Sequence, residues 1–340
     1  MIAAGKLAAL GRRELGLASL LLWILCAILI PLILPGFLVY QISVALTYAI
    51  AILGLNLLLG CNGQISMAQG VFFAVGGYAS AILVTHTSIP ALATLPIDAV
   101  ITGVLGFLVG IPALRLQGLQ LAITTLGLAA IVPPLALKLD WITHGASGIS
   151  LDKPDPPRWF PGNQDIWIYV LCVLGATICV VVMHRLLRGD AGRSFRAVRD
   201  NALIAAAHGI DLTKVRLAAF VTSACFAGFG GGLFALANGY VSPESFQVTL
   251  SLNFLVGAVV GGITSIQGAF IGALFVVFVP DWAGEVSPAL AALIYAVCLV
   301  GLMLVARDGV VGIVRSLLAR LTRTTIRERA RALPANPNEL

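Results

Sequence analysis

Continuous apolar runs dominate the chain and recur along it with short polar interruptions. Most of these runs are close to about 20 residues long, the length that an α-helix needs to cross a bilayer. Apolar and polar residues do not alternate within them, which excludes a barrel of strands around a polar lumen. The pattern therefore predicts an all-α polytopic membrane protein with about ten transmembrane helices.

The hydrophobic pattern places these ten spans to within about three residues. They are predicted at 15–34, 37–60, 70–86, 97–114, 119–137, 166–187, 214–237, 249–263, 266–280 and 288–306. The eighth and ninth are short and are joined by ITSIQG, so they form either two half-helices or one re-entrant pair. The first follows three basic residues, as a signal peptide would, but it is too long for one and is expected to be retained. The predicted organisation is a cytoplasmic N-terminus at 1–14, a transmembrane domain over 15–306 and a tail over 307–340.

Composition and charge support this class and orient the chain. Hydrophobic residues make up 59% of the chain and charged residues only 11%, whereas about a quarter of a soluble domain is charged. The net charge of +6 does not indicate nucleic acid, because the basic residues lie between the spans. With the N-terminus inside, all 21 lysines and arginines are cytoplasmic except Lys138, Lys153 and Arg158, in agreement with the positive-inside rule. These three belong to the segment 138–165, which is predicted to be the longest periplasmic loop.

Both termini are then cytoplasmic, and the basic tail is expected to contact anionic lipid.

Sequence motifs for catalysis and nucleotide binding are missing from the chain. It contains no GxxxxGK[ST], HExxH or GxSxG motif, and no pair of carboxylates lies within a predicted span. Binding of ATP by a P-loop, intramembrane catalysis and proton coupling are therefore disfavoured. The six cysteines show no CxxC spacing and the four histidines are scattered, so no metal site is expected. Sodium coupling through backbone oxygens would leave no such trace and stays open.

The 36 glycines cluster in a few segments, where small residues allow helices to pack closely. Gly63, Gln64, Ser66 and Gln69 form an uncharged polar run between two spans, and we expect this run to break a helix beside a transport pathway. Its G-Q-I-S turn pairs with G-I-T-S-I-Q-G in the second half, which suggests an internal two-half repeat. The other candidates for the pathway, polar residues in apolar spans, are Thr124, Thr125, Asn253 and Gln267.

The charged stretch RSFRAVRDNALIAAAHGID, residues 193–211, interrupts the apolar pattern. It predicts a short amphipathic helix with charged residues on one face and Phe195, Val198 and Ala202 on another. Gly209 is expected to end this helix in the left-handed conformation, and Asp211 to cap the next one. The helix either lies on the lipid surface or docks a soluble partner. The docking interpretation rests on Arg193, Arg196, Arg199, Asp200, Ala205, Ala206, His208 and Gly209.

Several segments together resemble branched-chain amino acid permeases of the LivM type, a family of ABC importer subunits. They are ILGLNLLLGCNGQISMAQGVFFAVGGYASAIL, RLQGLQLAITTLGLAAIV, THGASGIS, the region from RSFRAVRD to YVSPESF, VVGGITSIQGAFIGA and RDGVVG. They cover about half of the chain and follow one another in order. The stretch 193–211 is similar to the coupling loop of such permeases, known as the EAA loop. The glutamate of that pattern has no counterpart, because Leu203 stands six residues before Gly209.

The resemblance implies a type II ABC importer-like permease for small amino acids, above all leucine, isoleucine and valine. It implies a heterodimer with a second, LivH-like permease, two ATPase subunits that dock on the loop 188–213, and a periplasmic substrate-binding protein. ATP and Mg²⁺ would bind to the ATPases, so no cofactor is expected on this chain, and its place would be the bacterial inner membrane. Urea, amides or aromatic acids are alternative solutes within the family. A stand-alone secondary transporter or channel and a non-transporting scaffold are alternatives from other classes.

Overall fold

The computed structural model describes residues 29–312 apart from 32, 88, 117, 158–159, 161 and 306–308. The helices are α2 (Gly36–Asn56), α3 (Gln69–His86), α4 (Ala91–Ala113), α5 (Leu119–Lys138), α6 (Asp140–Thr143), α7 (Gln164–Arg188), α8 (Asp190–Asp200), α9 (Ala202–Ala207), α10 (Leu212–Asn238), α11 (Val248–Gly261), α12 (Ile266–Val286) and α13 (Ala291–Val305). Shorter elements are a π-helix, η1 (Leu57–Cys61), and two 3-10 turns, η2 (Gly145–Ser147) and η3 (Pro243–Phe246). Strands β1 (Ile149–Ser150) and β2 (Tyr240–Val241) pair in antiparallel fashion.

Apolar helices occupy the positions of the second to the tenth predicted spans. Within the described part of the chain, seven helices are long and apolar enough to cross a membrane, and α11 is a shorter apolar helix of 14 residues. The prediction of a polytopic all-α membrane protein is confirmed, while the count of about ten spans is not. The first predicted span, the N-terminus at 1–14 and most of the tail lie outside the described residues.

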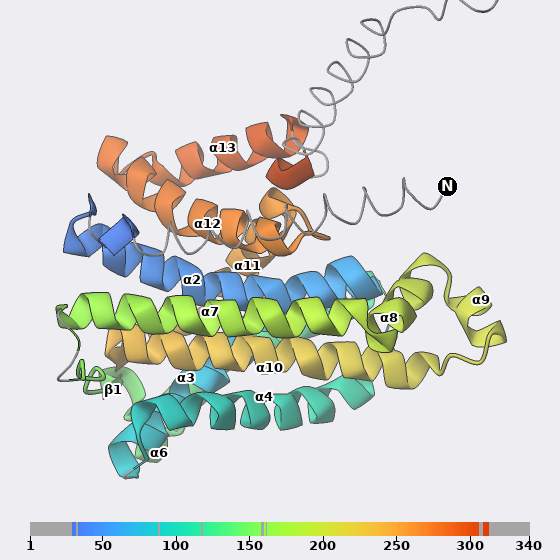
Figure 1. Ribbon diagram of the computed structural model, residues 1–340, viewed down its shortest axis with the longest axis horizontal. Helices are drawn as coiled ribbons and strands as arrows, with labels where there is room; N and C mark the ends of the chain where they lie inside the picture. Colours follow the sequence, from blue (N-terminus) through green and yellow to red (C-terminus); the bar gives the residue numbers. More distant parts are fainter. Residues whose placement is uncertain are drawn as a thin grey trace, which may run out of the picture.

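Helix α10 is the central helix of the bundle, and α2, α3, α4 and α7 pack around it (Figure 1). Its glycines allow this close packing: a Cβ on Gly231 would lie only 1.9 Å from the carbonyl oxygen of Phe73 in α3. On α4, a Cβ on Gly106 would lie 2.6 Å from Cβ of Ala224. Lipid tails are as apolar as the helices, so no hydrophobic effect drives helices together in a membrane. Their association depends instead on such close contacts. A buried cluster of rings fills the interior beside them: Tyr48, Phe73, Phe234, Phe246 and Phe254.

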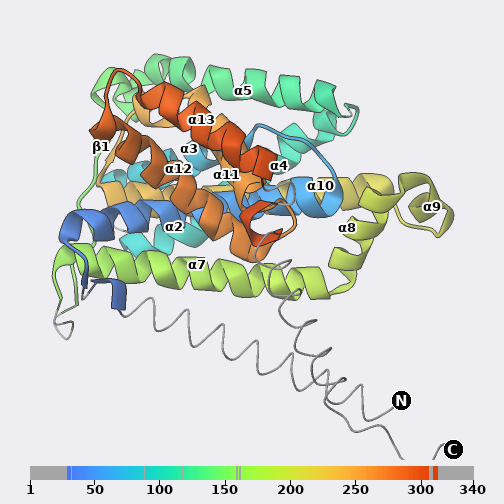
Figure 2. The same ribbon diagram turned by 90° about the horizontal axis from the view of Figure 1, so that it is seen from above.

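The bundle has two ends that differ in structure. Helices α8 and α9 project at one end, which we call the loop end, and β1, β2 and α6 lie at the other, the strand end (Figure 1). Helices α2 and α7 run from the strand end to the loop end, and α10 runs back. Helix α12 packs on α2 and α13 packs on α12, while α5 and α7 lie on opposite sides of the bundle (Figure 2).

Two predicted span boundaries were wrong. Helix α4 begins at Ala91, before the predicted 97, and α12 continues to Val286, past the predicted end at 280. Pro280, the last residue of the predicted ninth span, lies inside α12. The carboxylate of Asp281, which follows it, accepts a hydrogen bond of 2.5 Å from Nε2 of Gln41 in α2. Because α2 supplies this polar partner, the helix can carry an acidic residue where the sequence suggested a loop.

Candidate functional site at the loop end

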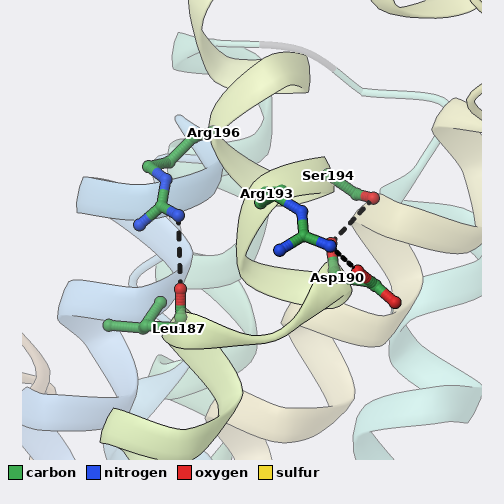
Figure 3. A network of polar contacts seen from close by, with 5 residues as sticks. All are labelled: Leu187, Asp190, Arg193, Ser194 and Arg196. Carbon is green, nitrogen blue, oxygen red and sulfur yellow. Dashed lines mark hydrogen bonds and ion pairs between the residues drawn. The ribbon is translucent and has the colours of Figure 1, made fainter. Parts of the chain in front are cut away.

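The corner between α7 and α8 is held by side chains of α8 itself. Arg193 forms an ion pair with Asp190, and the hydroxyl of Ser194 donates to the Asp190 carbonyl at 3.1 Å (Figure 3). Nη2 of Arg196 donates to the carbonyl oxygen of Leu187, at the end of α7, at 3.2 Å. The last carbonyls of a helix have no partner within it, so a guanidinium there is complementary in charge and hydrogen bonding. Arg196 therefore connects α8 to the end of α7, whereas the exposed Arg193–Asp190 pair lies within α8.

Helix α8 is amphipathic as predicted, with Phe195 and Val198 buried and its arginines on the exposed side. The helix does not continue to Gly209, however, because Asn201 adopts an extended conformation with φ −159°. The Asn201 side chain then accepts hydrogen bonds of 3.1 Å from the amides of Leu203 and Ile204 and so begins the separate helix α9. The predicted single helix was wrong, and asparagine before the run ALIAAA was the N-cap signal that could have corrected it.

Helix α9 presents an apolar tip to solvent at the far point of the loop. The side chains of Leu203 and Ile204 are 83% and 57% exposed, whereas Ala205 is 4% exposed and faces inward. Ala206 and His208 are exposed, and His208 Nδ1 lies 2.9 Å from the carbonyl oxygen of Ile204. This exposed apolar pair is a candidate contact surface, either for a soluble partner or for lipid. Leu203 and Ile204 were not among the residues predicted for docking, which included the neighbouring Ala205 and Ala206.

Gly209 and Asp211 connect this tip to the central helix as predicted. Gly209 has φ +83°, and a side chain there would be strained by the backbone although it would meet no other atom. Asp211 caps α10 by accepting from the amides of Thr213 and Lys214 at 3.0 and 3.1 Å. The hydrogen bond from the Lys214 amide is the main reason that the pKa of the Asp211 carboxyl lies below its usual value.

The polar run at 63–69 breaks the helical structure, as predicted. Helix α2 passes into η1, Gly63 has φ +74°, residues 63–67 are not helical, and α3 begins at Gln69. The amide of Met67 donates to Oγ1 of Thr125 in α5 at 2.8 Å. Gln69 Nε2 donates to the carbonyl of Ala51 in α2 at 2.7 Å. We call residues 62–68 the first break; it is fixed between α2 and α5, and α3 starts inside the bundle.

Helix α3 is anchored at this start by two further helices. The hydroxyl of Ser223 in α10 donates to Oε1 of Gln69 at 3.0 Å, and the amide of Gly70 donates to Oγ of Ser251 in α11 at 3.2 Å. The first amides of a helix lack partners within it, and here side chains of other helices supply some of them.

A second break, residues 262–265, separates α11 from α12 and lies against the first. Gly262 has φ +112°, and Nδ2 of Asn56 in α2 donates to the carbonyl of Ser265 at 3.1 Å. A Cβ on Gly60 would lie 2.0 Å from the carbonyl oxygen of Ile263. The G-Q-I-S and G-I-T-S-I-Q-G turns, paired in the sequence, thus meet at the end of α2.

The structure brings together only some of the predicted pathway residues. Ser66 and Gln69 are buried at the first break, where Thr125 contacts it. Thr124 is exposed and its hydroxyl donates only within α5, to Gln120. Asn253 is half-buried and Gln267 exposed, and neither makes a side-chain hydrogen bond to another described residue.

Sequence reasoning missed two polar features of this bundle. Asn62 is only 3% exposed, and neither its amide oxygen nor its nitrogen has a hydrogen-bond partner within the described residues. Asp98, in α4, is fully buried against Gly232 of α10, and both its carboxylate oxygens lack a partner there too. The sequence did show Asp98 within an apolar run, and an intramembrane acid is by itself a signal of function or of special packing. Among the described residues no group of three or more His, Cys, Asp or Glu is placed to hold a metal ion.

Comparison with known proteins identifies the family of this chain. The profile of the family described as "Branched-chain amino acid transport system / permease component" matches residues 37–307. The permease protein LivM of Salmonella typhimurium is 34% identical over 258 residues, which are 69% of this chain and 61% of the relative. LivM of Escherichia coli K12 is 34% identical over 259 residues, with the same two shares.

A more distant relative is the permease protein LivH of Salmonella typhimurium. It is 24% identical over 253 residues, which are 68% of this chain and 80% of the relative. The match to the two LivM proteins spans 61% of their own length. No solved structure matches the chain significantly. The match of the family profile from the start of α2 to the end of α13 shows that the chain belongs to the branched-chain amino acid transport system permease family.

Proposed function

We propose that this chain is the permease subunit of an ATP-driven ABC importer for branched-chain amino acids: leucine, isoleucine and valine. The observation that carries the proposal is the family match over 37–307, which includes every long apolar helix of the bundle. The relatives named LivM are described as permease proteins of high-affinity branched-chain amino acid transport. The chain itself would be non-catalytic, and ATP and Mg²⁺ would bind to separate ATPase subunits.

The loop 188–213 is the proposed docking site for an ATPase. Leu203 and Ile204 offer a compact apolar contact, and burying such a side chain contributes about 1.5–3 kcal/mol. Around it, Arg193, Arg196 and Arg199 provide positive charge on an exposed face, with Asp200 beside them. Ala205 supports the fold of α9 from within, so its contribution to docking is indirect.

The proposed orientation follows from this docking site. The loop end faces the cytoplasm of a bacterial inner membrane, with both termini on that side, and the strand end faces a periplasmic substrate-binding protein. A second, LivH-like permease completes the pathway, and the sequence relationship of this chain to LivH makes a pair of similar subunits reasonable. Closure of the ATPases would rock the helices and alternate access to a pathway between the two permeases. The breaks at 62–68 and 262–265 are proposed to border that pathway.

The docking site is tested by removing its apolar tip. We expect the double substitution Leu203→Ser and Ile204→Ser to abolish co-purification of the ATPase subunits with the permease. Leu290→Ser is the matched control, because this leucine is 51% exposed in the turn at the strand end. Equal recovery of ATPase with the double variant and the control would contradict the proposed docking site.

The substrate is tested on the whole importer in proteoliposomes that contain the binding protein. We expect uptake of labelled leucine to be inhibited by isoleucine and valine and not by urea or short amides. Inhibition by urea or an amide alone would assign the chain to another solute.

A further inference from the structure

One arginine of the loop reaches out of it and into the helical bundle. Nη1 of Arg199 donates to the carbonyl oxygen of Gly60 in η1 at 2.6 Å, across 139 residues of sequence. The Arg199 side chain also passes over the first break. A Cβ placed on Gly63 would lie only 3.1 Å from Cγ of Arg199. Its remaining contact is the exposed pair with Asp200, which contributes little.

The position of Gly60 explains why an arginine is needed there. The carbonyls of Leu58 and Leu59 accept from the amides of Gln64 and Gly63 as η1 ends. The chain then leaves the helical conformation, and the Arg199 guanidinium provides the donor for the Gly60 carbonyl. A π-helix such as η1 is rare, and those that occur are often found at functional sites. The guanidinium therefore completes the end of η1 at the residue where the backbone changes direction.

Gly60 also connects the two breaks. It is packed directly on the backbone of Ile263 in the second break, and Asn56, one turn earlier, donates to Ser265 in that break. A shift of Gly60 must displace Ile263, since the two backbones have no space between them. The bond from Arg199 to Gly60 thus acts on both breaks at once.

The polar groups of the first break are not all satisfied in this conformation. Both amide atoms of Asn62 and Oε1 of Gln64 are buried without a partner in the described part of the chain. Such groups cost free energy, so an arrangement that pairs them would compete with the present one. Movement of the loop has a discrete effect only if the segment that it acts on has two arrangements.

We infer that Arg199 is a positioning residue that transmits movement of the docked loop to both helix breaks through the carbonyl of Gly60. This inference rests on the proposed function and adds the connection between docking site and pathway. Arg193 and Arg196, on the same helix, bond only to Asp190 and Leu187 at the α7–α8 corner (Figure 3). They carry the same charge without the connection, so Arg193→Gln is the control where the state of the first break is measured without the ATPases.

The first experiment measures ATP hydrolysis and leucine uptake by the complete transporter in proteoliposomes. We expect Arg199→Gln to retain the ATPase subunits and to hydrolyse ATP, while uptake per ATP hydrolysed falls about tenfold, as the loss of one charge-assisted hydrogen bond implies. Arg199→Lys should recover part of the ratio, because an ammonium can still donate to the carbonyl. The control is Arg185→Gln, which removes the same charge from an exposed arginine of α7 outside the docking loop and should keep the wild-type ratio.

Two results of this experiment would overturn the inference. One is a wild-type ratio of uptake to hydrolysis in Arg199→Gln. The other is loss of the ATPases from Arg199→Gln in proportion to its loss of uptake, which would confine the role of Arg199 to docking. Absence of ATP-dependent uptake by the wild-type complex would instead refute the proposed function.

A second measurement does not depend on the ATPases. A nitroxide spin label at Ile65→Cys, in the first break, is introduced into the permease after its other cysteines are replaced. We expect Arg199→Gln to increase the mobility of this label and Arg193→Gln to leave it unchanged. Identical spectra for the two variants would show that Arg199 does not hold the break.

Discussion

Replacement of Gln69 by methionine tests whether the start of α3 is anchored as the structure indicates. Gln69 is 2% exposed and bonds to the carbonyl of Ala51 and to the hydroxyl and, at 3.4 Å, the carbonyl of Ser223. Interhelical hydrogen bonds in membrane proteins contribute about 0.6 kcal/mol on average and up to about 1.7 kcal/mol. Methionine has a similar length and leaves little cavity, so the lost bonds dominate. We expect Gln69→Met to lower the free energy of unfolding by about 1–2 kcal/mol.

Thermal denaturation of the purified permease in detergent measures this effect. Gln267→Met is the matched control, because Gln267 occupies the first turn of α12 but is exposed and makes no described side-chain hydrogen bond. The midpoint for Gln69→Met should fall by several degrees, and that for Gln267→Met should stay at the wild-type value. Equal midpoints for the two variants would refute the assignment of these hydrogen bonds as the anchor of α3.

Three other features give predictions of the same kind. Gly231→Ala should lower the free energy of unfolding by about 1–3 kcal/mol through overpacking, whereas Gly127→Ala, with open space at its Cβ, should be neutral. Equal effects of the two substitutions would disprove the close crossing of α10 and α3. Asn201→Ala removes the cap of α9, which contributes about 1 kcal/mol, and should speed amide exchange in that helix several-fold. Ser194→Ala should leave this exchange unchanged, and exchange at the wild-type rate in Asn201→Ala would contradict the cap. The lowered pKa of Asp211 means that its cap is intact above the ordinary value of 3.8 and is lost only as the pH falls through the lower folded value. Unfolding midpoints of Asp211→Asn and wild type should therefore differ by a constant amount from pH 7 to pH 5, and a difference that changes in this range would refute the expectation.

The sequence allowed the prediction of most helices because apolar runs of membrane length leave few alternatives. The errors came where contacts with a distant segment of the chain decide the local structure. The ninth span was predicted to end at 280, but α12 continues past it, and Gln41 of α2 donates to the carboxylate of Asp281. The pairing of β1 with β2 joins segments about 90 residues apart, and two-residue strands carry no periodicity.

The sequence predicted only part of the candidate site, because the rest depends on contacts between distant segments. The amphipathic pattern identified α8, and glycine with φ above zero was correctly expected at Gly209. The exposed Leu203 and Ile204 were overlooked, because an apolar pair in an alanine-rich segment gives no sign of which side faces solvent. The bond from Arg199 to Gly60 could not be predicted, since local sequence does not encode a contact between two loops so far apart.

ATP-driven uptake of leucine is the measurement that tests the central proposal most directly. The permease is reconstituted with its partner permease, the ATPases and the binding protein, and in parallel without the ATPases. The proposal predicts accumulation of leucine only when the ATPases and ATP are both present, and none with a non-hydrolysable ATP analogue. Leucine transport by liposomes that contain this chain without any ATPase would contradict it and would identify a stand-alone transporter or channel.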